Sequence, residues 1–301
     1  MRYRDRNGND LTGNQKQDLL LRLLYGTAAG RALIRPLARP AVSRLVGALM
    51  NARCSAPAAR WVVKRRGLDL TDYKETRFAS YNAFFHRELL PHKRPVAPGA
   101  DVLISPCDGK LLVCPIEADS RFAIKHSLYS LGSLLRDEGL AARYEGGTIL
   151  IFRLTVDDYH RYCYVADGWK TENVRLPGVL HSVNPVAVDH FPVYKENARE
   201  YCLLETEAFG AILVMEVGAL LVGKICNHHG ACAVRRGMEK GYFEFGGSTI
   251  VLGFERGRIA VDGDILGNSR EGLETLVRLG ERIGTAASRD VRPFSVSAAP
   301  R

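Results

Sequence analysis

A serine that follows two glycines offers the most distinctive chemistry in this sequence. In YFEFGGSTIVLGF, residues 242–254, Ser248 lies between an aromatic run and a β-branched run, and each run is typical of a strand. A serine hydroxyl becomes a good nucleophile when a base removes its proton. Attack on the carbonyl of Gly247 would be intramolecular, and a glycine there puts no side chain in the way and leaves the backbone free to adopt unusual φ and ψ values.

Such an attack predicts a self-cleaving chain. The acyl group would move from nitrogen to oxygen, β-elimination would then break the chain between Gly247 and Ser248, and Ser248 would become a pyruvoyl group. A pyruvoyl ketone forms a Schiff base with an amine and accepts the electrons released on loss of CO2, the role that pyridoxal phosphate plays elsewhere. The alternative is that Gly-Gly-Ser-Thr forms a plain loop.

Three other side chains could assist the serine. Asp108, in the turn SPCDGK, either caps its own turn or orients a histidine. His160 follows a predicted strand in TVDDYHRYCYVADG, beside Asp157 and Asp158. His181 has a similar place in GVLHSVNPVAV, and either imidazole could move a proton.

Other kinds of site have weaker support. The segment ICNHHGAC combines two cysteines with two adjacent histidines, but a structural zinc site needs four ligands, commonly in two separated pairs, so we expect no metal. The sequence has no Walker loop or dinucleotide fingerprint in a strand-to-helix setting, which argues against nucleotide chemistry. The G-x-S-x-G elbow of α/β hydrolases is also missing.

The positive charge of the chain is concentrated near its N-terminus. The 301 residues have a formal net charge of +9, and residues 19–68 hold ten lysines and arginines without a single acid. Leucine and valine accompany these cations at helical spacing, as in LLLRLLYG and SRLVGALM, which suits a helix lying on an anionic membrane surface. A solvated helical bundle and a nucleic-acid surface are the alternatives, and the scarcity of stacking Tyr and Phe argues against nucleic acid.

The composition changes near residue 70, and this defines the predicted organisation. Pro36, Pro40 and Pro57 divide the basic segment into short helices. Farther along, short β-branched runs such as GTILIFRL and STIVLGF are separated by glycine or charged residues, which indicates largely antiparallel sheets. We therefore predict an α+β protein. Residues 1–70 form a short basic amphipathic helical membrane-associating segment, and residues 71–301 form a β-rich catalytic domain.

Seven scattered cysteines indicate a reducing, cytoplasmic compartment.

Several motifs together resemble the phosphatidylserine decarboxylase family. They are, in chain order, FFHREL, SPCDGKL, DDYHRY, HSVNP, NARE, VGALLVGKI, KGYFEFGGSTIVL and DGDIL, and the likeness runs from about residue 81 to residue 280. The resemblance implies a proenzyme that cleaves itself into a large chain, residues 1–247, and a small chain, residues 248–301. It also implies decarboxylation of phosphatidylserine to phosphatidylethanolamine, through a Schiff base with a pyruvoyl group made from Ser248, by a peripheral protein on the cytoplasmic face of the cell membrane.

The resemblance further implies an Asp-His-Ser relay for the cleavage. Asp108 and Ser248 match the pattern directly. Many members carry two histidines in Tyr-His-Arg-x-His, whereas this chain has His160 at the first place and Cys163 at the second, so the base is either His160 or His181. The expected partners are phosphatidylserine, an anionic membrane surface and the two chains of one precursor; a homo-oligomer stays open, and no nucleic acid is expected.

Two other functions remain open at this stage. A pyruvoyl decarboxylase could act on a soluble amino acid instead of a lipid. A non-catalytic membrane or nucleic-acid adaptor would keep its full-length chain and carry no ketone.

Overall fold

The computed structural model describes residues 2–13, 15–124, 127–155, 158–183, 193–220, 224–244 and 248–287. Ser248 is the first residue of the last range, while Gly247 lies outside the described residues.

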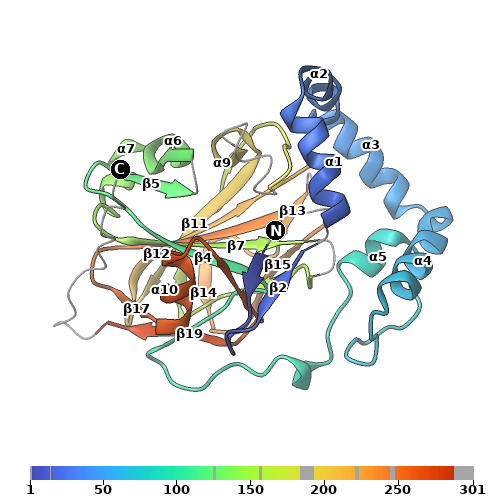
Figure 1. The fold of residues 1–301 in the computed structure, drawn as a ribbon. Helices are drawn as coiled ribbons and strands as arrows, with labels where there is room; N and C mark the ends of the chain where they lie inside the picture. Colours follow the sequence, from blue (N-terminus) through green and yellow to red (C-terminus); the bar gives the residue numbers. More distant parts are fainter. Residues whose placement is uncertain are drawn as a thin grey trace.

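A large, mostly antiparallel sheet forms the centre of the molecule (Figure 1). Its strands follow the order β14-β9-β11-β12-β16-β7-β4-β18-β1-β2, and β10 pairs with β11. Their bounds are β1 (Arg2–Arg4), β2 (Asp10–Thr12), β4 (Gly109–Pro115), β7 (Thr148–Leu154), β9 (Gly168–Lys170), β10 (Val174–Leu176), β11 (Arg199–Thr206), β12 (Gly210–Val217), β14 (Cys232–Val234), β16 (Ser248–Phe254) and β18 (Glu274–Val277).

Smaller elements cover the two faces of this sheet. The strands of the smaller sheets are β3 (Val102–Ile104), β5 (Arg121–Ile124), β6 (Ser127–Ser130), β8 (Arg161–Cys163), β13 (Ile225–Asn227), β15 (Glu239–Phe243), β17 (Ile259–Val261) and β19 (Arg282–Ala286). The short helices of this part are α5 (Tyr81–Phe85), η2 (Pro91–Lys93), α6 (Leu131–Leu135), α7 (Glu138–Ala142), α9 (Val193–Glu196) and α10 (Gly263–Arg270).

Hydrophobic side chains of the central strands point alternately to the two faces of the sheet and form a hydrophobic core on each face. In β7, Leu150 and Phe152 pack into one core with residues of β8 and β15, while Ile149 and Ile151 pack into the other with residues of α1, α2 and α6. Successive side chains of a strand point to opposite faces, so each central strand is buried on both faces. We call these two sides of the sheet the β8 face and the helical face.

The basic N-terminal segment forms helices along one side of the sheet (Figure 1). These are α1 (Gln15–Gly26), α2 (Ala28–Leu37), α3 (Pro40–Asn51), η1 (Arg53–Ser55) and α4 (Ala56–Arg66). Pro36 lies in the last turn of α2, and Pro40 is the first residue of α3. Proline has no N–H to donate, so it tends to end a helix and is well tolerated at a helix start. Large hydrophobic side chains remain exposed on these helices: Leu19, Leu20, Leu23, Leu33, Leu37, Leu45, Leu49 and Trp61. No helix in the described ranges is both long and apolar enough to cross a bilayer.

The α+β architecture with mainly antiparallel sheets agrees with the prediction, but the first twelve residues do not follow the expected helical segment. β1 pairs in parallel with β18 and antiparallel with β2, so these residues extend the central sheet. Arg6 holds this hairpin in place through ion pairs with Asp262 and Asp264. Arg6 and these two aspartates are more than 250 residues apart in the sequence, so the local composition of residues 2–12 cannot reveal the contact.

Candidate active site

Ser248 begins a central strand and is fully buried. β16 pairs on one side with β7, where Ser248 lies opposite Leu154, and on the other with β12, where Thr249 lies opposite Val217. Side chains two residues apart share a face, so Ser248 points to the β8 face with Ile250. Its Oγ has no hydrogen-bond partner among the described residues. Buried hydroxyl groups are usually hydrogen-bonded, which makes this position a candidate for a functional role.

The segment that precedes Ser248 runs antiparallel to the segment that carries His160. Beyond the pair of Ser248 and Leu154, Tyr242 pairs with Arg161, and Phe243 N–H donates to the carbonyl of His160 over 3.0 Å. Between these two pairings, the described residues are 243–244 on one segment and 155 and 158–160 on the other. Ser248, opposite Leu154, and His160, whose carbonyl accepts from Phe243, thus belong to neighbouring segments of the fold.

His160 is buried and held in one tautomer. Its ring lies 3.8 Å from the ring of Phe85, centroid to centroid, and its Nδ1 is 2.9 Å from the main-chain oxygen of Asp158. Since a carbonyl only accepts, Nδ1 carries the proton and Nε2 presents a lone pair. Nε2 is also buried without a partner in the described part of the chain. Burial, aided by Arg87 and Lys110 and opposed by Asp158, lowers the pKa of His160 to about 3, so the ring is neutral near pH 7.

A buried ion pair fixes the turn before His160. Lys110 Nζ donates to both carboxylate oxygens of Asp158, over 2.8 and 2.6 Å, and to Thr155 Oγ1 over 3.0 Å. Thr155 N–H donates to the same carboxylate. Burial alone would raise the pKa of Asp158, but Lys110 and the Thr155 donors outweigh it and lower that pKa. The carboxylate therefore stays charged and holds the turn.

Asp108 is close in the fold but engages other groups. Its carboxylate accepts from Arg94 Nε over 3.0 Å, from Arg94 Nη2 over 2.7 Å and from Leu279 N–H over 2.9 Å. Within the described ranges it has no hydrogen bond to His160 or His181, so the acceptor that orients His160 is the Asp158 carbonyl. The turn with Asp108 nonetheless contacts the strand after His160, because Cys163 N–H donates to the carbonyl of Pro106.

Cys163 occupies the place at which the resemblance implies a second histidine. Its side chain is buried, and burial raises the pKa of its thiol to about 12. A neutral, buried thiol of this kind is neither an effective nucleophile nor a proton acceptor near pH 7. Cys163 therefore packs in the core and leaves the acid-base chemistry to other residues.

His181 lies on the helical face, where its ring is 6.0 Å from the ring of Tyr25, centroid to centroid. The Asn197 side chain accepts from His181 N–H and donates to the carbonyls of His181 and Gly218. Gly218 follows Val217, which pairs with Thr249, the residue after Ser248. His181 Nε2 lies 3.8 Å from Glu196 Oε2, and burial lowers the pKa of this ring while Glu196 opposes the shift. The two histidines thus have different surroundings: His160 packs against Phe85, and His181 lies beside Tyr25 and Glu196.

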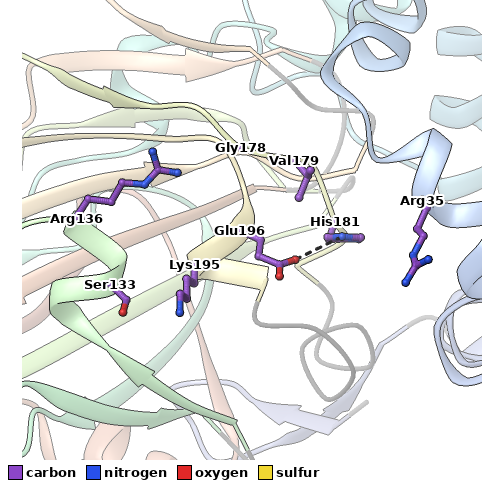
Figure 2. A pocket seen from close by; sticks show the side chains of 8 residues that line it. All are labelled: Arg35, Ser133, Arg136, Gly178, Val179, His181, Lys195 and Glu196. Atoms are coloured by element: carbon purple, nitrogen blue, oxygen red, sulfur yellow. Dashed lines mark ion pairs between the residues drawn. The ribbon is translucent and has the colours of Figure 1, made fainter.

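His181 also lines a cavity of about 740 Å³ (Figure 2). The other lining residues are Arg35, Ser133, Arg136, Gly178, Val179, Lys195 and Glu196. As for a metal, no group of three or more His, Cys, Asp or Glu side chains in the described residues is placed to hold one.

Sequence reasoning missed Lys110, Arg94 and Asn197. Lys110 lies two residues after Asp108 in SPCDGK, and Asn197 begins NARE, so both were within recognised motifs. Their roles depend on contacts across the sheet or between loops, such as Lys110 with Asp158 and Asn197 with Gly218. The sequence reveals the residue types, but the fold determines these partners.

Comparison with known proteins points to one family. The sequence model described as phosphatidylserine decarboxylase matches residues 81–285. The chain is 43% identical over 265 residues to phosphatidylserine decarboxylase proenzyme 2 of Clostridium acetobutylicum, covering 88% of this chain and 91% of the relative. It is 38% identical over 268 residues to the phosphatidylserine decarboxylase proenzyme of Chlamydia felis, covering 87% and 90%. The corresponding protein of Chlamydia caviae is 36% identical over 291 residues, covering 94% and 97%.

Proposed function

Because the chain belongs to the phosphatidylserine decarboxylase family, we propose that it cleaves itself between Gly247 and Ser248 and then converts phosphatidylserine to phosphatidylethanolamine and CO2. The observation that carries this proposal is a pair of buried atoms without partners among the described residues, Ser248 Oγ and His160 Nε2. One is a donor and the other an acceptor, and the pairings of β16 with β7 and of β15 with β8 support the proposal that the two meet.

In the proposed cleavage, His160 Nε2 takes the Ser248 hydroxyl proton while the oxygen attacks the Gly247 carbonyl. The amide becomes an ester at Ser248 Oγ. Loss of the Ser248 α-proton and rupture of its Cβ–Oγ bond then release the Gly247 carboxylate. Hydrolysis of the remaining dehydroalanine adds one water and expels one ammonia, leaving a pyruvoyl group at residue 248.

The other residues act by positioning in this proposal. The Asp158 carbonyl fixes the His160 tautomer, and Lys110 holds the turn through the Asp158 carboxylate. Asp108 acts in this proposal by positioning and not as a member of a relay. Paired with Arg94, it holds the turn whose Pro106 carbonyl accepts from Cys163 N–H, three residues after His160.

The residues around position 248 fit a pyruvoyl group. The position is buried at the start of a central strand, and the proposal brings His160 and His181 to it, the latter from a cavity that it lines. Such a group supplies a ketone that binds the substrate amine and takes up the electrons left by CO2. Around it, His160 supplies a neutral ring for proton transfer, and His181 faces the substrate from the cavity.

The test is the mass of the purified wild-type protein. We expect two chains, residues 1–247 and 248–301, with the small chain blocked to N-terminal sequencing and reactive toward carbonyl reagents. Their summed mass should exceed that of the intact chain by one water less one ammonia. Decarboxylation of phosphatidylserine in detergent micelles completes the test, and a folded single chain without a ketone contradicts the proposal. Turnover of free serine but not of lipid would reassign the substrate.

We further propose that residues 19–68 hold the protein on an anionic leaflet at the cytoplasmic face of the cell membrane. Exposed leucines and arginines occur together on α2 and α3, where Leu33, Leu45 and Arg44 are exposed. Such a surface inserts its apolar side chains while its cations meet lipid phosphates.

Replacing Arg31, Arg35, Arg39 and Arg44 with glutamine is expected to release the protein from vesicles of phosphatidylglycerol and phosphatidylcholine. At about 1 kcal/mol for each cation, the loss is roughly 10³-fold at low salt, and 0.5 M NaCl should mimic it. Vesicle cosedimentation measures the effect. A matched variant removes four exposed arginines elsewhere (Arg121, Arg143, Arg256 and Arg258), and equal binding by the two variants would refute the proposal.

A further inference from the structure

The cavity beside His181 has an excess of positive charge. Arg35, Arg136 and Lys195 line it, against the single carboxylate of Glu196. Glu196 is nearest to His181, and in the described part of the chain none of the three cations has a carboxylate partner. Three cations directed to one cavity repel one another, so an anion bound between them would relieve that repulsion.

The walls of the cavity are held rigidly. Arg199 is buried below them, and its guanidinium donates to the carbonyls of Ser133 and Leu134 on α6 and of Lys195 and Asn197 around α9. One buried side chain thus fixes the two short helices that carry Arg136 and Lys195. Burial, with Arg136 nearby, lowers the pKa of Arg199 to about 10, so it stays charged near pH 7 and adds to the positive field.

The cavity joins the other two parts of the proposed site. Arg35 enters from α2, between the exposed Leu33 and Leu37, while Arg136 and Lys195 enter from the opposite side (Figure 2). His181 leads from the cavity through Asn197 to Gly218, next to the partner strand of Ser248. The cavity therefore adjoins the surface that carries the exposed leucines, and hydrogen bonds link its wall to the end of β12, the strand that pairs with β16.

We propose that this cavity binds the phosphodiester of a glycerophospholipid headgroup, with Arg35, Arg136 and Lys195 as its ligands. The inference rests on the proposed function, because it gives the lipid substrate a place to dock. A volume of about 740 Å³ is within the range of sites for small ligands and accommodates a headgroup. With the phosphate held here, the acyl chains can stay in the leaflet beside α2 while the amine extends past His181 toward residue 248.

The test compares Arg136→Gln, Lys195→Gln and the double variant, because neither residue belongs to the basic segment at residues 19–68. Each single variant should raise the KM for phosphatidylserine in neutral detergent micelles roughly tenfold, and the double variant roughly a hundredfold, as for lost charged hydrogen bonds. The kcat should stay within about twofold. Arg143→Gln is the matched control, since Arg143 is exposed at the end of α7 and pairs with Glu255.

A soluble competitor separates a headgroup from free phosphate. Glycerophosphoserine should inhibit the wild type and lose that inhibition in the double variant, while inorganic phosphate should inhibit far less. Equal inhibition by the two compounds, or an unchanged KM in variants that cleave normally, would overturn this inference while the proposed function stands. A wild-type chain that neither cleaves nor decarboxylates lipid would instead refute the proposed function.

Discussion

Ser248→Ala is expected to accumulate as one chain of 301 residues without a ketone and without decarboxylase activity. Alanine cannot form the ester at Ser248 Oγ, so neither cleavage nor the pyruvoyl group can follow. The loss in kcat/KM should be on the order of 10⁴-fold or more, as when a covalent nucleophile is removed. Intact-mass measurement and a phosphatidylserine decarboxylation assay give the two readouts.

This variant should nonetheless fold. Ser248 Oγ has no hydrogen-bond partner among the described residues, so alanine removes a buried polar group instead of breaking a bond. Its circular dichroism should match that of the wild type. Ser269→Ala is the matched control, because its hydroxyl accepts from Val113 N–H far from the junction, and this variant should cleave and turn over. Cleavage of the Ser248→Ala chain at residue 247 would reject the intramolecular mechanism.

His160→Gln is expected to slow self-cleavage by roughly 10²- to 10⁴-fold, the usual contribution of a general base. Glutamine can still donate to the Asp158 carbonyl, but it cannot accept the Ser248 proton. Freshly synthesised protein, sampled over time on denaturing gels, gives the rate. His181→Gln is the comparison: it should cleave at a rate near that of the wild type and lose turnover, because His181 lies at the cavity.

Two further observations separate a base from a packing residue. Added imidazole should restore cleavage in His160→Gly, where the missing ring leaves space beside Phe85. Because burial lowers the pKa of His160 to about 3, the wild-type cleavage rate should stay level from pH 8 to about pH 5, without the fall near 6.5 of an exposed histidine. If His181→Gln blocked cleavage and His160→Gln did not, the base would be His181.

The sequence predicted the fold class because the central strands carry strong local signals. The run STIVLGF became β16, and YNAFF became α5, since β-branched and aromatic periodicity here agrees with the tertiary packing. The N-terminal hairpin was not predicted, because its pairing with β18 spans the whole chain. Periodicity in RYRDRNGND is too short to reveal a strand that a distant partner stabilises.

For the candidate site, Ser248, His160 and His181 stay predictions from the sequence, and only the fold shows their surroundings. Asp108 was expected to orient a histidine, and that expectation came from the motif alone. Its bidentate contact with Arg94 depends on how the segment before β3 folds back over the turn, which is a matter of tertiary contact. The Asp158 carbonyl as the partner of His160 could not be read from residue types at all, because any residue supplies a carbonyl.

The place of β16 in the middle of the sheet has a consequence for the fate of the severed protein. A fragment starting at Ser248 would contribute β16, β17, β18 and β19, bonded to β12, β7, β4 and β3 of the larger fragment. The nick would therefore leave a noncovalent heterodimer that copurifies under native conditions. Unfolding would separate its halves, so reassembly after denaturation should be second order and should slow on dilution.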